Sequence, residues 1–200
     1  MLKQAPMPNP SSEPRTPLHL RDARPDDALC LSVLAMQVFL DTYATQGIRT
    51  AIAREVLSTY SQASFDAALA DSKTHITVAE HDGHLIGFAQ LSFSSGHPLA
   101  PAGEQAELLR LYVQEPFTRA KVGSQLLMQA QRISADAGAT VLWLTPWVHN
   151  HRALAFYQKH AFVDHGLTHF VFEGESHENR VLAKSLQPPK VTTSPPRRER

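Results

Sequence analysis

The stretch between residues 107 and 144 constrains the fold most, because it reads as strand, helix and strand in succession. ELLRLYV at 107–113 has the composition of a β-strand, which Pro116 would end. Apolar residues then recur with a helical period, and Gly138 follows where a helix C-terminal cap is expected. The periodic positions are Val122, Leu126, Leu127, Ala130, Ile133 and Ala137. TVLWL at 140–144 is typical of a buried strand. This unit predicts a mixed α/β sheet that contains a parallel strand pair.

The rest of the chain supplies further strands and helices in the order βα(α), three strands, α, β, α, ββ. Strands are predicted at 18–23, 75–80, 84–93, 169–173 and 179–186, and helices at 25–43, within 50–70 and at 150–160. Asp82-Gly83 lies between two alternating runs and predicts a hairpin turn. In the first helix we expect Leu29, Val33, Leu34 and Met36 to form the apolar face and Cys30 to be a small buried residue.

Proline marks the ends of the predicted domain. Of fourteen prolines, five lie in residues 1–17 and four in 187–200. These segments lack the apolar area that would offset the entropy of ordering them, so we predict disordered tails around one domain at 18–186. Nineteen basic residues balance nineteen acidic ones, which excludes a nucleic-acid binder that relies on bulk positive charge. Without a run of about 18–20 apolar residues or a signal peptide, we expect no membrane partner and a cytoplasmic location.

Residues 112–127 carry the clearest chemical signal. A predicted strand leads through a short basic loop into a helix, and the loop contains Arg119, Lys121 and Gly123. A helix N-terminus offers unpaired N–H groups and partial positive charge, so this arrangement suits a pyrophosphate. The alternative is a helix that merely begins with a basic turn. Neither a GxxxxGK[ST] phosphate loop nor a GxGxxG dinucleotide motif occurs in the chain.

Two segments together resemble a known family. LYVQEPFTRAKVGSQLL at 111–127 resembles the acetyl-CoA motif of the GNAT N-acetyltransferase superfamily, and LWLTPWVHNHRALAFYQKHAFV at 142–163 resembles its next strand and helix. Within that superfamily the chain is most similar to the PaiA-type polyamine acetyltransferase branch. The resemblance implies a GNAT fold, with a mixed sheet of six or seven strands and about four helices. It also implies acetyl-CoA as cosubstrate and a primary amine as acceptor.

The resemblance also implies roles for particular residues. Glu107 would act as the base that deprotonates the amine, and Tyr157 as the donor to the leaving thiolate; each could instead be purely structural. Asn150 would either contact the cofactor arm or cap its helix. The remaining implied cofactor contacts are the backbone of Leu111, Tyr112 and Val113 and the loop residues Thr118, Arg119, Ala120, Lys121, Val122, Gly123 and Ser124.

The loop departs from the family pattern at two positions. Thr118 replaces Gln or Arg, and Lys121 replaces the first glycine. If Lys121 has a helical φ, its ammonium group can add to the phosphate contacts; if the position needs a positive φ, Lys121 carries strain. In the second motif Ala161 stands where the family usually has glycine.

The acceptor is less constrained than the cofactor. A small molecule or polyamine is the first expectation, and a peptide amine is the alternative. The acidic residues Asp41, Glu55, Asp66 and Glu115 could attract a cation, but the sequence does not place them together. Trp147 would line the acceptor pocket or pack under a loop. Eleven histidines show no acidic or cysteine companions at ligand spacing, so we predict no metal site.

Two other functions are compatible with the sequence. The same fold could be a catalytically silent CoA-binding or interaction module. A phosphate ligand unrelated to CoA would leave the second motif unexplained. The resemblance also implies that a homodimer can form.

Overall fold

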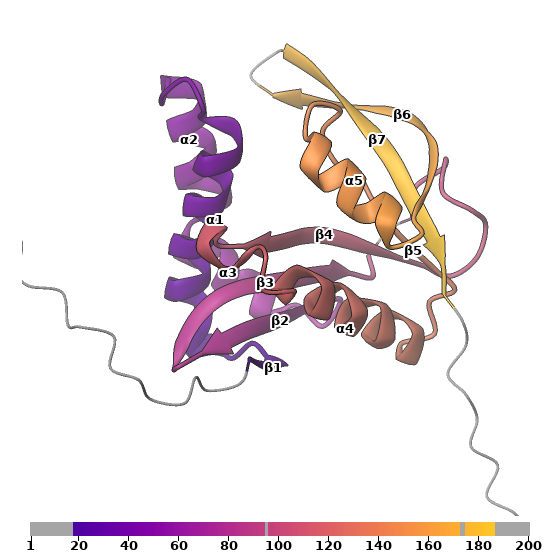
Figure 1. The fold of residues 1–200 in the computed structure, drawn as a ribbon, viewed down its shortest axis with the longest axis horizontal. Helices are drawn as coiled ribbons and strands as arrows, with labels where there is room; N and C mark the ends of the chain where they lie inside the picture. Colours follow the sequence, from indigo (N-terminus) through magenta and orange to yellow (C-terminus); the bar gives the residue numbers. More distant parts are fainter. Residues whose placement is uncertain (1–17, 95, 173–174, 187–200) are drawn as a thin grey trace, which may run out of the picture.

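A single seven-stranded sheet runs through the domain, in the order β1-β2-β3-β4-β5-β7-β6 (Figure 1). The computed structural model describes residues 18–94, 96–172 and 175–186; both predicted tails lie outside these residues. The strands are β1 (His19–Asp22), β2 (Thr74–His81), β3 (His84–Ser92), β4 (Gln105–Val113), β5 (Val141–Leu144), β6 (Val163–Phe172) and β7 (Glu175–Ser185). Only β4 and β5 pair in parallel; the other neighbouring pairs are antiparallel. The mixed sheet is therefore confirmed.

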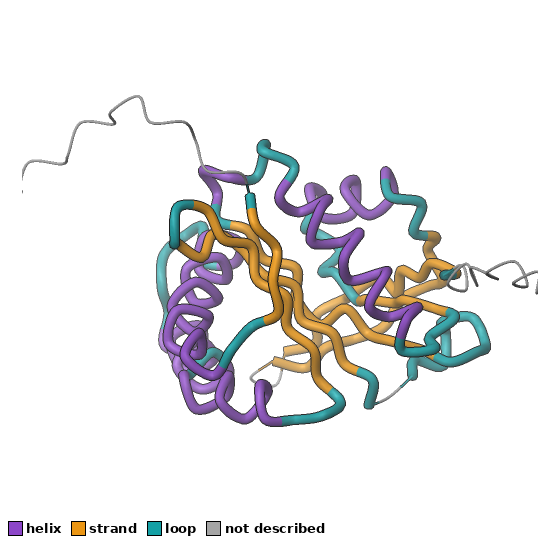
Figure 2. Tube along the Cα trace, turned by 90° about the horizontal axis from the view of Figure 1, so that it is seen from below, coloured by secondary structure: helices purple, strands orange, loops and turns teal. Residues whose placement is uncertain are grey.

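Helices cover both faces of this sheet (Figure 2). The described α-helices are α1 (Ala28–Tyr43), α2 (Thr50–Thr59), α3 (Gln62–Ala70), α4 (Val122–Asp136) and α5 (His151–Lys159), and short 3-10 helices span Pro25–Asp27 and Glu115–Phe117. The segment 50–70 forms two helices because Ser61 caps the second one, its side chain accepting a hydrogen bond from the Ser64 N–H. Among the described residues, no helix has the length and apolar character needed to span a membrane.

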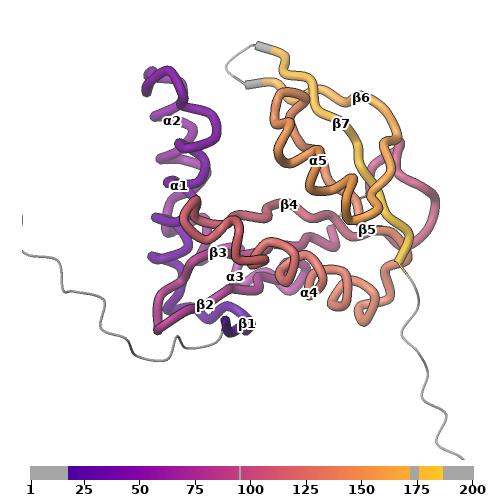
Figure 3. The backbone as a smooth tube through the Cα atoms, in the orientation of Figure 1, coloured from indigo at the N-terminus to yellow at the C-terminus, as the bar shows by residue number. Residues whose placement is uncertain are grey.

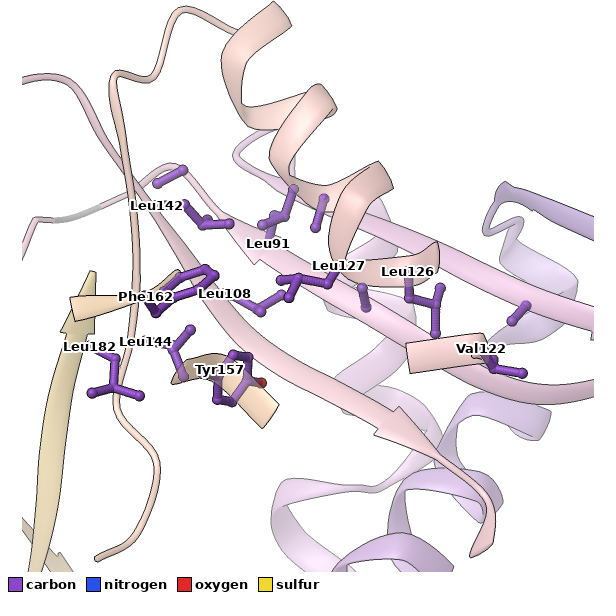
Figure 4. Packing of buried hydrophobic residues seen from close by; sticks show 14 of the residues in the cluster. Leu91, Leu108, Val122, Leu126, Leu127, Leu142, Leu144, Tyr157, Phe162 and Leu182 are labelled. Carbon is purple, nitrogen blue, oxygen red and sulfur yellow. The ribbon is translucent and has the colours of Figure 1, made fainter. Parts of the chain in front are cut away.

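Two large apolar cores form, one on each face, beside a small cluster around Trp143. The first, between the sheet and α1–α3, includes Leu31, Phe65 and Phe88. The second, between the sheet and α4–α5, includes Leu126, Leu127, Leu142 and Tyr157 (Figure 4). The predicted period is confirmed at Val122, Leu126, Leu127, Ala130 and Ile133, which pack in this core, but not at Ala137, which is exposed just after α4 ends. At about 25 cal/mol per Å² of apolar surface, such burial is the main stabilising contribution.

The hairpin prediction at Asp82-Gly83 is confirmed. Both residues have positive φ, 50° and 74°, as a two-residue turn between twisted strands requires. Gly138, with φ 90°, likewise follows the end of α4 as expected.

The predicted apolar face of the first helix is wrong in part. Leu29 and Val33 are 56% and 59% exposed, and Cys30 is exposed as well. The buried face instead carries Leu31 and Leu34 together with the small residues Ala28, Ser32 and Ala35. Small side chains let this face approach the sheet closely, and the Ser32 hydroxyl donates to the Tyr60 carbonyl at 2.6 Å. The helix has more apolar residues than one face can bury, so packing decides which are covered.

A β-bulge in β4 sets which side chains face which core. Gln90 of β3 lies opposite Arg110, whereas the next residue, Leu91, lies opposite Leu108; Leu109 therefore has no partner. One extra residue reverses the alternation of side chains along a strand. Arg110 and Tyr112 consequently lie on the α1 side of the sheet.

Beyond the bulge, β4 stays paired with β3 but no longer pairs with β5. The parallel pairing with β5 covers only residues 105–107 of β4 and 141–143 of β5. The chain on the β5 side then turns away into α5, while β4 continues to Val113, and the two halves of the sheet diverge (Figure 3). The edge of β4 from Leu109 onward thus faces no strand among the described residues.

Candidate functional site

The first cavity lies beside this open edge of β4 and has a volume of about 520 Å³. We call it the loop-side cavity, since Thr118, Arg119 and Gly123 of the loop before α4 form one wall. Residues of α5 form the facing wall, and α1 closes one end. Its other lining residues are Val38, Asp41, Thr42, Tyr43, Leu111, Tyr112, Val113, Glu115, Asn150, Arg152, Ala153, Phe156 and Tyr157.

The β4 backbone presents hydrogen-bonding groups to the loop-side cavity. The Gln114 N–H donates to the Ile86 carbonyl, which fixes the alternation of the ladder with β3. Tyr112 is therefore bonded toward β3, while the backbone groups of Leu111 and Val113 point to the open edge. A cofactor arm lying along β4 can use the groups of Leu111 and Val113 in the way a further strand would.

The loop before α4 places its residues in different surroundings. The loop-side cavity is lined by Thr118, Arg119 and Gly123. In contrast, Ala120 and Lys121 are exposed, and Val122 is buried in the second core. The Ser124 hydroxyl is 3.0 Å from Nε2 of His160. The cavity therefore meets the N-terminal end of α4, where the first N–H groups have no partner within the helix and the dipole favours an anion. This supports the predicted pyrophosphate site.

Lys121 adopts the left-handed conformation, with φ 63° and ψ 10°. Of the two alternatives that the sequence left open, the structure selects strain. A non-glycine residue in this region costs about 1–2 kcal/mol. Ala161, with φ 63°, carries the same kind of strain.

Two variants of Lys121 separate strain from charge. Both Lys121→Gly and Lys121→Ala remove the ammonium group, but only glycine relieves the positive φ. We expect Lys121→Gly to exceed Lys121→Ala in free energy of unfolding by about 1 kcal/mol, measured by urea denaturation. Equal stabilities would mean that the loop is not left-handed at this residue.

The absence of a side chain at Gly123 leaves space for a ligand, and the packing of the protein does not require glycine at this position. A Cβ built there would lie 3.7 Å from the nearest Phe156 ring atom and 3.8 Å from Val113 Cγ2, which are ordinary contacts. We therefore expect Gly123→Ala to raise the free energy of unfolding by about 0.5–1 kcal/mol.

The same change should weaken CoA binding. A methyl group at the N-terminus of α4 would push a phosphate away from N–H donors, and charge-assisted hydrogen bonds contribute about 1.5–3 kcal/mol each. We expect a loss of at least about 10-fold in CoA affinity, measured by calorimetry. The control is Met128→Ala, on an exposed part of the same helix, which should keep wild-type affinity. A Gly123→Ala protein that binds CoA normally would contradict the site.

Tyr157 lies on α5 where the second core meets the loop-side cavity. It is 7% exposed and packs against Phe156 and Phe162. Figure 4 shows its ring beside Leu144 at the end of the core. Burial raises the pKa of Tyr157 well above its ordinary value, so its hydroxyl stays protonated and can donate a hydrogen bond.

Asn150 caps its helix, the second of the two roles considered for it. Its Oδ1 accepts a hydrogen bond from the Ala153 N–H at 3.0 Å. Its side chain also bonds Tyr43, which partly opposes the rise in the Tyr43 pKa caused by burial. Next to it, Arg152 donates to Glu115 at 2.6 Å and joins α5 to the start of the loop.

A second cavity of about 450 Å³ lies on the other face of β4. We call it the hairpin-side cavity, since Phe170, His177 and Asn179 of β6 and β7 form one wall. The opposite wall comes from α1 and α2, which rise on the other side of β4 (Figure 3). Its other lining residues are Phe39, Tyr43, Arg49, Ile52, Glu55, Thr59, Tyr60, Leu109, Arg110, Tyr112 and Trp147. Trp147 thus lines a cavity, one of its two predicted alternatives.

Tyr43 and Tyr112 line both cavities, so the cavities meet at these two rings. Tyr60 donates to or accepts from Tyr112 at 3.0 Å between their hydroxyl oxygens. With Tyr157, all four tyrosines of the chain gather around this junction. At this junction two ligands, one in each cavity, could approach each other and react. Sequence reasoning missed this convergence, because the four residues belong to four distant segments.

Glu107 lies further back on β4 than the cavities. It pairs with Ser92 on one side and Trp143 on the other, and it is not among the residues that line either cavity. Burial raises the pKa of Glu107, and the positive charge of Arg110 partly opposes that rise. The half-buried carboxylate is thus a stronger base than an exposed one, but it would reach a reacting amine only through water.

The histidines do not form a metal site within the described residues. There, no group of three or more His, Cys, Asp or Glu side chains is placed to hold a metal ion.

Comparisons with known proteins agree with this geometry. The model of the acetyltransferase (GNAT) family matches residues 42–162. An uncharacterized N-acetyltransferase of Mycobacterium tuberculosis is 31% identical over 128 residues, which cover 64% of this chain and 77% of the relative. A spermidine N(1)-acetyltransferase of Thermoplasma acidophilum is 34% identical over 83 residues, 40% of this chain and 45% of the relative. The crystal structure of PaiA N-acetyltransferase from Thermoplasma acidophilum, in complex with coenzyme A, superposes with a TM-score of 0.68 at 24% identity, covering 85% of this chain and 99% of that one.

Proposed function

The chain belongs to the acetyltransferase (GNAT) family, and from this premise we propose that it transfers the acetyl group of acetyl-CoA to a primary amine of a small molecule. The family predicted from the two sequence motifs is thereby confirmed, and with it the enzyme class, N-acetyltransferase, and the cosubstrate, acetyl-CoA. The acceptor and the residue roles are proposals. The observation that carries them is the meeting of two cavities at Tyr43 and Tyr112.

The loop-side cavity fits acetyl-CoA. Its wall combines an anion site at the N-terminus of α4, the cationic Arg119, and the outward backbone groups of Leu111 and Val113. The first two features suit the pyrophosphate, and the backbone groups suit the amide-bearing arm of the cofactor. Gly123 supplies the close approach that a phosphate needs. Acetyl-CoA, when bound, supplies the thioester: the amine nitrogen bonds to its carbonyl carbon, the C–S bond breaks, and the proton lost by the amine ends on the sulfur.

The hairpin-side cavity would hold the acceptor amine. Both substrates can then be bound at once, so direct transfer in a ternary complex needs no acetylated side chain. Amines with a pKa near 10 are about 99.9% protonated at pH 7, so removal of a proton is part of the barrier. We assign this task to Glu107 acting through water, because burial raises its pKa toward neutrality.

Tyr157 would support the departing sulfur. Its buried hydroxyl is a fixed donor at the end of the loop-side cavity. A donor held in place before the reaction needs no reorganisation when negative charge develops on the sulfur.

An acceptor screen tests the proposal. The protein is incubated with acetyl-CoA and a panel of primary amines, polyamines among them because a spermidine acetyltransferase is a relative. Acetylated amine, detected by mass spectrometry, is the expected product. Thiol reagents can report CoA release only in a Cys30→Ser background, because Cys30 is exposed. A protein that binds CoA but acetylates no amine would instead be a silent CoA-binding module.

A further inference from the structure

Arg110 is the basic side chain that β4 itself places in the hairpin-side cavity. The bulge at Leu109 puts it on the same face as Tyr112, two residues further along the strand. Side chains two apart on a strand lie about 7 Å from each other. Tyr112 lies at the junction with the loop-side cavity. A small molecule bound to Arg110 could therefore reach that junction.

The guanidinium group of Arg110 is held in a fixed orientation. Its Nη1 donates to Oε1 of Gln90 at 2.5 Å, and the group lies over the Tyr60 ring at 5.2 Å from the centroid. The Tyr60 side chain is a further hydrogen-bond partner of the guanidinium, and within the described residues no carboxylate forms an ion pair with Arg110. A guanidinium has five N–H donors, so Arg110 keeps donors beyond those that Gln90 and Tyr60 use and can bind a planar anion with them.

The charges around the hairpin-side cavity do not suit a polycation. Of the four acidic residues considered from the sequence, only Glu55 lines it, and its Oε1 accepts a hydrogen bond from Thr59 at 2.7 Å. Asp41 and Glu115 line the loop-side cavity instead. Among the described residues that line the hairpin-side cavity, Glu55 is the one carboxylate, and Arg110 places a positive charge beside the aromatic rings, so a polyamine would find no cluster of carboxylates there.

The other walls are largely aromatic. Phe39, Tyr43, Tyr60, Trp147 and Phe170 line the same cavity. Such rings bury apolar surface and can pack against an apolar side chain of the acceptor.

We propose that the acceptor is an amino carboxylate, a free amino acid with an apolar side chain, and that Arg110 selects it by binding its carboxylate. The inference rests on the proposed function and names the substrate class of the same site. The carboxylate would bind the remaining N–H donors of Arg110, which would direct the amine of the same molecule toward Tyr112 and the junction. The aromatic wall would take the side chain.

Matched acceptors test the role of the carboxylate. L-Phenylalanine and L-leucine are compared with 2-phenylethylamine and isoamylamine, which have the same side chains but no carboxylate, and with spermidine. Values of kcat/KM are corrected for the fraction of free amine at the assay pH. We expect each amino acid to exceed its decarboxylated analogue by at least about 10-fold, because a charge-assisted pair is lost.

Variants of Arg110 separate recognition from a structural role. Arg110→Gln should lower kcat/KM for the amino acids by about 10- to 100-fold, mainly through KM, and change the value for 2-phenylethylamine by less than about 3-fold. Arg110→Lys keeps the charge and should restore part of the loss. The control is Arg132→Gln, an exposed residue of α4, which should leave both acceptors unchanged.

The outcomes are distinguishable. If spermidine or a decarboxylated amine is acetylated more efficiently than either amino acid, the inference is wrong while the proposed function stands. The inference also fails if Arg110→Gln lowers activity equally for both acceptor types, since that indicates a structural role. If acetyl-CoA binds but no amine yields a product, the proposed function itself fails. Better activity on peptide N-termini than on free amino acids would move the acceptor to a different class and overturn the inference.

Discussion

Replacing Tyr157 by phenylalanine is expected to lower kcat on the order of 100-fold, because removing one preorganised hydrogen-bond donor from a reacting centre has about this effect. The KM for acetyl-CoA should change by less than about 3-fold. The ring packs against Phe156 and Phe162, and phenylalanine keeps that packing. The measurement is steady-state kinetics with saturating acceptor, with CoA affinity determined separately by calorimetry.

The high pKa of Tyr157 gives this prediction a pH signature. Burial raises the pKa of the phenol, so the hydroxyl keeps its proton throughout the range in which the enzyme can be assayed. The leaving thiolate, whose thiol has a pKa near 8.5, is a weaker base than that phenolate, so we expect Tyr157 to stabilise the sulfur by hydrogen bonding without becoming ionised. The activity ratio of wild type to Tyr157→Phe should therefore stay constant from pH 6 to pH 9. Wild-type turnover in the variant would remove the assigned role.

Replacing Glu107 by glutamine is expected to lower kcat/KM by about 100-fold at pH 7, as loss of a general base does. The sign of the pH dependence follows from its ionisation. Burial raises the pKa of Glu107 above 4.5, and a general base acts only when deprotonated, so we expect activity to be lost as pH falls through the raised value. The amine independently loses reactivity by a factor of about 10 per pH unit below its own pKa.

The two ionisations together make the test specific. Below the pKa of Glu107, log kcat/KM of the wild type should rise with pH at a slope of 2, whereas Glu107→Gln should keep a slope of 1. The control is Glu104→Gln, since Glu104 is exposed just before β4 and lines neither cavity. Parallel profiles for wild type and Glu107→Gln would show that another group, or the amine alone, governs the pH dependence.

Local sequence patterns predicted most of the helices and strands, because helical periods, turn residues and caps each depend on residues close together in the chain. The period of residues 122–137 gave α4, Asp82-Gly83 gave the hairpin, and Gly138 gave the end of a helix. The first helix shows where this reasoning stops. Its sequence is apolar on more than one side, and the burial of Ala28 and Ser32 in place of Leu29 and Val33 depends on how closely α1 can approach the sheet.

The candidate site divides in the same way. Its cofactor half lies in one continuous strand, loop and helix, 111–124, and could be located from residue types and spacing. The half that we propose for the acceptor draws on α1, α2, β4 and the β6–β7 hairpin, which no local pattern brings together. The sequence could not decide whether Lys121 has a helical or a positive φ, because φ is a property of the folded loop.

By itself the sequence determined the order of strands and helices, the family, and the loop suited to a pyrophosphate, since each depends on residues that are neighbours along the chain. Only the tertiary structure decided that a single bulge at Leu109 turns Arg110 and Tyr112 toward the hairpin-side cavity, and that the early end of the β4–β5 pairing opens the edge of β4. The physical reason is that side chains alternate along a strand. One unpaired residue exchanges the two faces, and its position depends on the register with β3, a neighbour far away in the sequence.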